Sequence, residues 1–150
     1  MKKLIILLLA VASTVMTFGQ DKFCDPALAE EVNNYIAKNG GIWLKDFYVS
    51  LPKFSEKNKN PEEKYSIVLS ADYIYRFILT SSPKYQGDAQ LNIEDKSGKL
   101  VAILKTKSKN NPEASDIDIK ATDTYTFKVN FLSGSEGCAL FTICYVRKKT

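Results

Sequence analysis

The sequence predicts an all-β protein, an antiparallel β-sandwich of about eight strands with a jelly-roll-like arrangement and one N-terminal α-helix packed on it. Three observations predict this fold. Apolar residues follow a helical period in one early segment only, the period changes to two from residue 42 onward, and turn residues separate the later apolar runs at short intervals.

The chain begins with a pattern typical of a secretory signal peptide. Lys2 and Lys3 precede the apolar run 4–11, and the small residues Thr17 and Gly19 precede a cleavage point before Gln20. The apolar run is shorter than the roughly 20 residues that span a bilayer, so an uncleaved anchor is the less favoured alternative. We therefore expect a signal peptide at residues 1–19 and a single sandwich domain at residues 20–150.

One amphipathic helix is expected at about residues 26–38. Asp25 can cap free N–H groups, and Pro26 suits the first helical position. The apolar positions expected on one helical face are Leu28, Val32, Tyr35 and Ile36. The sequence Asn-Gly-Gly that follows ends the helix.

The remaining chain reads as strands and polar turns. The first strand begins near residue 42 and ends before Pro52, and the polar segment 53–64 is expected to be an exposed loop. Further strands are expected at residues 65–70, 73–80, 89–94, 100–106, 115–120, 124–132 and 138–147. Both faces of the last strand are apolar, so we expect the helix to cover the outer face of its sheet.

Three cysteines, Cys24, Cys138 and Cys144, are the disulfide candidates. In an oxidising compartment two of them are expected to pair. Cys138 and Cys144 share one strand, which places their Cα atoms about 20 Å apart, beyond the roughly 7 Å limit for a bridge. Cys24 is therefore one end of any bridge, and its partner stays open.

Composition argues against several classes of function. The chain has 21 basic residues, 17 acidic residues and no histidine, and removal of residues 1–19 takes away two lysines, leaving a net charge of +2. The lysines are scattered, and the basic tail at residues 147–149 reads as a solvated terminus, so no nucleic-acid partner is expected. Without histidine, the usual hydrolase triad is excluded, and no cofactor is expected.

Other chemical sites have weak support. Acidic pairs such as Glu94 with Asp95 read as surface residues rather than glycosidase carboxylates. Asp116, Asp118 and Asp123 could offer oxygen ligands to Ca²⁺ but lack the dense spacing of a calcium loop. The serines considered for a Ser/Lys arrangement are Ser66, Ser81 and Ser82. We assign no catalytic or metal residue, and the binding residues stay unknown.

Aromatic residues are abundant in the expected strands. They favour a structural role, because aromatic side chains fill the pleat and the core of a sheet. An exposed Trp43 beside two exposed tyrosines would instead indicate recognition of a glycan or a protein.

Residues 65–131 resemble the bacterial pre-peptidase C-terminal (PPC) domain family, small β-sandwich modules attached to exported enzymes. The stretches that carry the resemblance are LSADYIYRFIL, LNIEDKSGKLV and ATDTYTFKVNF. The chain departs from the family at Asp72 and Asp123, where turn glycines are expected, although Asp tolerates such turns. The resemblance implies a sandwich with a binding or accessory role, and it carries over no site residue.

Together these patterns predict an exported, non-enzymatic module, secreted or periplasmic, that recognises a protein or a glycan at the cell envelope or outside the cell. The alternative is an inhibitor or accessory subunit of a secreted enzyme, which would present a rigid loop such as 53–64 or 81–88.

Overall fold

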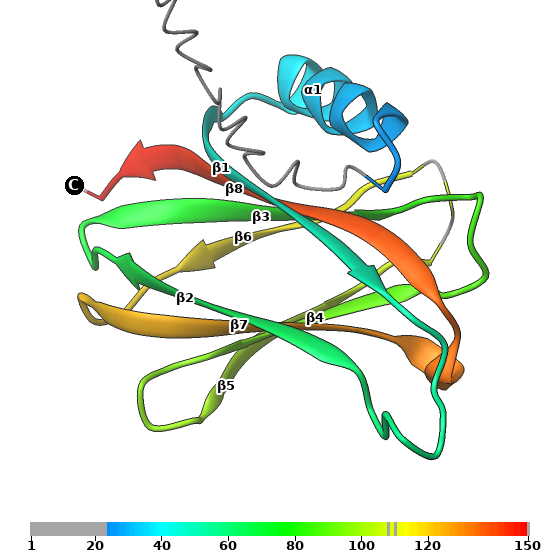
Figure 1. The fold of residues 1–150 in the computed structure, drawn as a ribbon. Coiled ribbons are helices and arrows are strands. Elements are labelled where there is room, and N and C mark those ends of the chain that lie inside the picture. Colours follow the sequence, from blue (N-terminus) through cyan, green and yellow to red (C-terminus); the bar gives the residue numbers. More distant parts are fainter. Residues whose placement is uncertain (1–23, 108, 110, 150) are drawn as a thin grey trace, which may run out of the picture.

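The protein is a two-layer sandwich of antiparallel sheets with one helix on its outside (Figure 1). The computed structural model describes residues 24–107, 109 and 111–149, so the predicted signal peptide and the mature start at Gln20 lie outside the described residues. The elements are α1 (Ala27–Asn39), β1 (Ile42–Leu51), β2 (Glu62–Leu69), β3 (Tyr73–Ser81), β4 (Ala89–Glu94), β5 (Leu100–Lys105), β6 (Glu113–Asp118), β7 (Asp123–Phe131), the short 3₁₀ turn η1 (Leu132–Gly134) and β8 (Gly137–Lys148).

The strand order is that of a jelly roll. One sheet has the order β1-β8-β3-β6 and the other has the order β2-β7-β4-β5, with antiparallel neighbours throughout. The eight-stranded sandwich with one helix that the sequence predicts is therefore confirmed. In the described part of the chain, no helix has the length and apolarity that a bilayer crossing requires.

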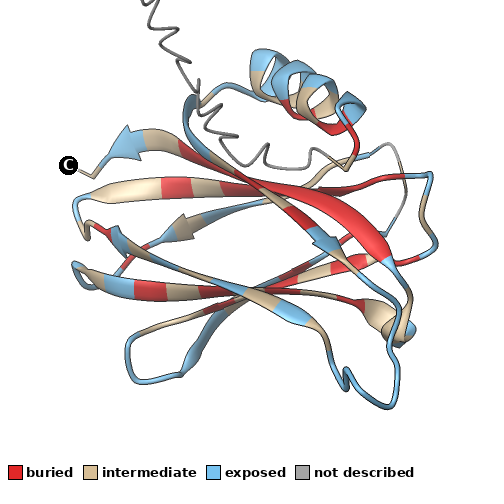
Figure 2. Cartoon of the chain, viewed as in Figure 1, coloured by how far each residue is buried: buried red, intermediate tan, exposed pale blue. Residues whose placement is uncertain are grey.

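The main core lies between the two sheets, where inward-facing residues of every second position meet (Figure 2). Phe47 stacks on Phe141 with ring centroids 4.4 Å apart, and the ring centroid of Phe127 lies 5.7 Å from that of Phe141. Each of these rings comes from a different strand, so the aromatic residues predicted to fill the core join both layers.

A second, smaller core joins the helix to the outer face of the sheet that contains β8. Leu28 and Val32 of α1 are buried against Ile78, Leu140 and Cys144. The disulfide joins Cys24, just before the helix, to Cys138 at the start of β8, with Cα atoms 5.8 Å apart. The predicted helix position and the role of Cys24 are confirmed, and Cys144 is a buried free thiol.

The start of the helix differs in detail from the prediction. The helix begins at Ala27, and its N–H donates to the Asp25 carboxylate at 3.3 Å. Asp25 is fully buried and also accepts hydrogen bonds from Ser82 and from the Lys84 ammonium, the latter at 2.8 Å. Burial opposes ionisation of this carboxyl, but the bonds from Lys84 and Ser82 outweigh it and lower its pKa.

The predicted loop 53–64 was wrong at its end, because β2 begins at Glu62 and pairs there with Asn130 of β7. The last charged residues of this segment, Glu62, Glu63 and Lys64, lie on an edge strand. Charged side chains are common there because they discourage pairing with other chains. The predicted strand 115–120 is displaced by two residues and runs from Glu113 to Asp118.

Candidate binding groove beside strand β5

The strands β5 and β6 are edge strands of the two sheets and lie next to each other on one open side of the sandwich. Two hollows lie along this side. One, of about 530 Å³, is lined by the β4–β5 turn and by the loop between β6 and β7. The other, of about 360 Å³, is lined by the end of β5 and the start of β6. We call the two hollows together the side groove.

Aliphatic side chains are exposed along the β5 wall of the side groove. Leu100, Val101 and Ile103 are 47%, 40% and 47% exposed, whereas Leu104 points into the core and is buried. Large apolar residues on an exposed edge strand are unusual, because such an edge is a template for pairing with another chain. This concentration is the main feature of the site.

A tight turn sets the start of β5. The Asp95 carboxylate accepts hydrogen bonds from the backbone N–H groups of Ser97 and Lys99 at 2.9 and 3.0 Å, and from the Ser97 hydroxyl. Gly98 has φ of 80°, a conformation that favours glycine. The hydrogen bonds from Ser97 and Lys99 lower the pKa of Asp95. Asp95 therefore acts as a turn residue.

The other acidic residues near the side groove are paired with lysines. Lys96 contacts Asp123 at 2.5 Å, Lys128 contacts Glu94 at 2.7 Å, and Lys107 contacts Glu113 at 3.5 Å. These contacts place the predicted acidic candidates Glu94 and Asp123 in ion pairs.

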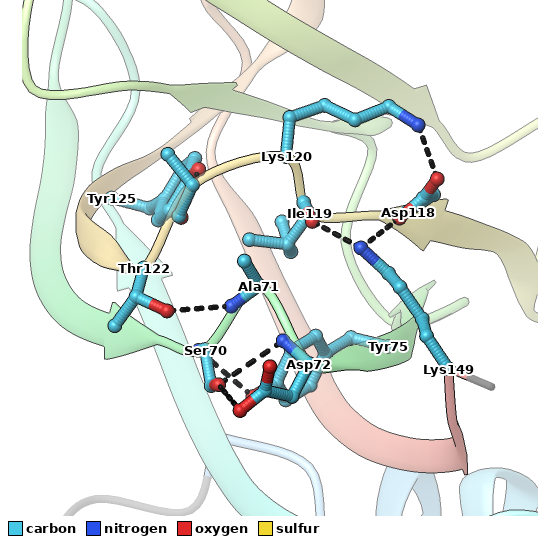
Figure 3. Close-up of polar contacts among 11 residues, drawn as sticks. Ser70, Ala71, Asp72, Tyr75, Asp118, Ile119, Lys120, Thr122, Tyr125 and Lys149 are labelled. Carbon is cyan, nitrogen blue, oxygen red and sulfur yellow. Dashed lines mark hydrogen bonds and ion pairs between the residues drawn. The ribbon is translucent and has the colours of Figure 1, made fainter.

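Asp118 lies between two lysines at the end of β6 (Figure 3). Lys120 and Lys149 both form ion pairs with its carboxylate, and the Lys149 ammonium also donates to the carbonyl of Ile119. Hydrogen bonds from Lys120 and Lys149 lower the pKa of Asp118. The two ammonium groups neutralise the negative charge of the Asp118 carboxylate, which a calcium ion would need from its ligands.

Asp116 has a partner of its own, because its carboxylate accepts two hydrogen bonds of 2.6 and 2.8 Å from Arg76. The three aspartates considered for Ca²⁺ therefore share no cationic partner, and together they contact four different cations. Among the described residues, no group of three or more acidic, Cys or His side chains could hold a metal ion.

The serines considered for nucleophilic chemistry differ in exposure. Ser81 and Ser82 are buried and donate to Thr106 and Asp25, respectively. Ser66 is exposed on β2, opposite Thr126. Buried hydroxyls with structural partners are poorly placed to attack a substrate, so Ser81 and Ser82 have structural roles.

A second surface, here called the tyrosine hollow, is lined by Leu44, Tyr73, Tyr75 and Tyr145 and has a volume of about 350 Å³. Tyr73 meets Tyr145 edge to face with ring centroids 5.1 Å apart. Trp43, next to Leu44, is 53% exposed, whereas Tyr73 and Tyr145 are half-buried. Trp43 pairs with Cys144, whose side chain belongs to the core beneath the helix, and Trp43 does not line the tyrosine hollow. An exposed Trp43 beside two exposed tyrosines is therefore not found among the described residues.

No protein-family model and no curated protein matches the chain. Among solved structures, the periplasmic inhibitor PliG of g-type lysozyme from Aeromonas hydrophila is similar, with 9% identity and a TM-score of 0.45 over 71% of this chain and 88% of that one. A structure of the CBM51-2 and INT domains of Clostridium perfringens ZmpB, in complex with GlcNAc, has 9% identity and a TM-score of 0.47 over 69% of this chain and 30% of that one.

The C-terminal domain of EclA, a sugar-binding protein, is also similar, with 19% identity and a TM-score of 0.42 over 67% of this chain and 79% of that one. At these identities, no site residue can be transferred from such structures to this chain. None of these matches bears on the resemblance to the PPC family, which stays a prediction.

The sequence prediction did not identify the side groove. The one local signal was the uninterrupted apolar run LVAIL between Lys99 and Lys105. A half-buried strand normally alternates apolar and polar residues, and a run without alternation normally indicates a strand covered on both faces. Here the strand lies at an edge, so the same run leaves side chains exposed.

Proposed function

We propose that this protein is an exported, non-enzymatic binding module that recognises a segment of a partner protein at the side groove. The observation that carries the proposal is the exposure of Leu100, Val101 and Ile103 on one edge strand beside two hollows. A concentration of exposed large apolar residues of this kind marks interaction sites in soluble proteins.

The pairing of charges supports a binding role over catalysis. A general acid or base needs a carboxyl whose pKa lies near the working pH. The pKa values of Asp95, Asp118 and Asp123 are instead lowered, by hydrogen bonds from Ser97, Lys120 and Lys96 in turn. These carboxylates stay ionised and accept hydrogen bonds from neighbouring residues, which suits a structural role at the edge of a binding site.

The disulfide supports export. Cys24 pairs with Cys138, and such bonds persist in oxidising compartments. This agrees with the signal peptide predicted at residues 1–19, and we therefore propose a secreted or periplasmic location.

Two alternatives rest on other surfaces. An inhibitor could use the loop between β1 and β2, where Phe54 is 46% exposed and its N–H donates to the Gly134 carbonyl at 2.8 Å. A glycan could stack in the tyrosine hollow, because aromatic rings with hydroxyl groups suit sugar recognition.

Parallel captures with matched variants test the proposal. We immobilise the mature protein and four variants, and expose each to the same envelope extract and medium. The variants are Ile103→Lys, Val68→Lys, Phe54→Ala and Leu44→Ala, the last at an exposed residue of the tyrosine hollow. Val68 is a matched control because it is 68% exposed on β2 of the same sheet.

Proteins captured by the wild type and by Val68→Lys, but lost with Ile103→Lys, support the proposal. Selective loss with Phe54→Ala favours the inhibitor, and loss of a glycan with Leu44→Ala favours the tyrosine hollow. Equal capture by wild type and Ile103→Lys contradicts binding at the side groove.

A further inference from the structure

We infer that the side groove binds an extended peptide segment that pairs with β5 as an added strand and carries acidic residues at both ends of its apolar stretch. This inference rests on the proposed function and specifies its partner. Strand addition to a free sheet edge is a common mode of peptide recognition, in which backbone hydrogen bonds provide affinity and side-chain contacts provide specificity.

The backbone of β5 has a free side. The N–H of Thr106 donates to the carbonyl of Ala89 of β4 at 3.0 Å, so the backbone groups of Thr106 face β4. Leu104 and Ala102, which pair with Leu91 and Ile93, lie two and four residues earlier and face β4 as well. In an antiparallel ladder, alternate residues turn both N–H and C=O toward the same neighbour. Ile103 and Lys105 therefore turn theirs away from β4, toward the open side where β5 has no paired strand among those described.

The side chains of β5 can provide contacts on both faces of an added strand. Ile103 lies opposite Asn92 of β4 on the outer face of the sheet, and it is 47% exposed. Leu100 and Val101 line the larger hollow together with Ile119 and Tyr125. An added strand would cover the exposed β5 residues, and its alternate side chains could enter the hollow.

The charges at the ends of β5 indicate an acidic partner. Lys99 precedes the strand and Lys105 ends it, both side chains are exposed, and neither forms an ion pair with a described residue. Lys96 and Lys107, farther out, are already paired with Asp123 and Glu113. Among these four lysines, the two without an ion pair are therefore the two that bracket the apolar stretch. Together with the hydrogen bond from Ser97, the charge of Lys99 also helps to lower the pKa of Asp95.

The same lysines argue against a second copy of this chain as the partner. An antiparallel pairing of two β5 strands that places Val101 opposite Ile103 also places Lys99 opposite Lys105, and a parallel in-register pairing places each lysine opposite itself. Like charges directly opposite each other destabilise a sheet, and edge lysines are a common protection against self-association. A strand with acidic flanks meets no such repulsion.

A display library of random peptides of about twelve residues, long enough to span a strand and its flanks, tests the inference. Peptides are selected on the mature protein and counter-selected on Ile103→Lys, with Val68→Lys as the matched control. We expect enriched peptides with alternating apolar residues, Asp or Glu on both flanks and no central proline. Enrichment of peptides without acidic flanks, or with central prolines, would overturn the inference.

Two changes to the strongest peptide then separate backbone pairing from charge. Methylation of the amide nitrogens that face β5 should weaken binding at least tenfold, because each blocked N–H removes a backbone hydrogen bond. The double variant Lys99→Glu/Lys105→Glu should bind the acidic peptide about tenfold more weakly and prefer a lysine-flanked version. A methylated peptide that binds as tightly as its parent contradicts strand addition, and an unchanged charge preference contradicts the acidic partner.

Failure of the inference is distinguishable from failure of the proposed function. Peptides or captured proteins that depend on Ile103 but tolerate backbone methylation leave the side groove as a binding site and remove strand addition. If neither the library nor the extract yields any binder that depends on Ile103, both the inference and the proposed function are wrong.

Discussion

Arg76 holds Asp116 through two parallel bonds of 2.6 and 2.8 Å, and its remaining terminal nitrogen donates to the carbonyls of Asn39 and Gly40 at the end of α1. One side chain on β3 thus joins β6 and the last turn of the helix. The free carbonyls at a helix C-terminus favour such a cation, and the planar guanidinium fits the carboxylate on its other edge.

Replacement of Arg76 should therefore destabilise the fold. We expect Arg76→Ala to lower the free energy of unfolding by about 2 kcal/mol, because four hydrogen bonds are lost and the carbonyls of α1 lose their cation. The free energy of unfolding of Arg76→Lys should lie between those of Arg76→Ala and the wild type, since an ammonium cannot form the bidentate contact of the guanidinium. Urea denaturation measures both, and a lysine variant as stable as the wild type would contradict this account.

The disulfide should contribute more stability than any single ion pair. It joins residues 114 positions apart, and closure of a loop of this size corresponds to about 4 to 5 kcal/mol in the chain-entropy estimate. We expect Cys24→Ser/Cys138→Ser to lower the melting temperature strongly and to loosen α1. Cys144→Ala, which leaves the disulfide intact, is the control. Equal melting temperatures for the double variant and the wild type would disprove a stabilising role.

The free thiol of Cys144 should influence stability at alkaline pH. Burial raises its pKa from the ordinary value of 9.0 to about 11. Because the pKa of this thiol is higher in the folded protein than in the unfolded chain, the neutral thiol stabilises the fold fully below pH 9. This stabilisation is lost as the pH rises through 11. We expect a loss of about 2 to 3 kcal/mol over this window. This loss should be absent from Cys144→Ala, which is checked by comparing the unfolding curves of the wild type and the variant at each pH.

Asp25 should influence stability at the opposite extreme of pH. Its pKa is lowered below the ordinary value of 3.8, since the bonds from Lys84 and Ser82 outweigh burial. Its contribution is therefore complete above about pH 4 and is lost as the pH falls through the lower, folded value. Asp25→Asn should be less stable at pH 7 by about 1 to 3 kcal/mol. Its stability should fall less steeply in acid, and an identical acid profile for both proteins would contradict this assignment.

Much of the fold could be predicted because local pattern and tertiary structure agree. The helical spacing of Leu28 and Val32 and the apolar faces of the last strand both point to a helix packed on a sheet, and the two cores have this arrangement. The partner of Cys24 could not be predicted. Cys138 and Cys144 lie on the same face of β8, and only the position of the chain before α1 selects Cys138.

The binding site was harder to predict than the fold. Whether the run from Leu100 to Leu104 is buried or exposed depends on which strands lie at the edges, and that order arises from pairings between distant segments. The acidic candidates illustrate the same limit. Asp116 and Asp118 are two positions apart on β6, yet one binds Arg76 and the other binds Lys120 and Lys149.

Hydrogen exchange of the β5 amides, followed by NMR, tests the central claim most directly. The N–H groups of Ile103 and Lys105 face away from β4 and should exchange quickly in the free protein, whereas that of Leu104, paired with Leu91, should exchange slowly. In complex with a peptide selected at the side groove, both fast amides should become protected. If they stay fast while the peptide protects amides elsewhere, β5 is not the binding edge.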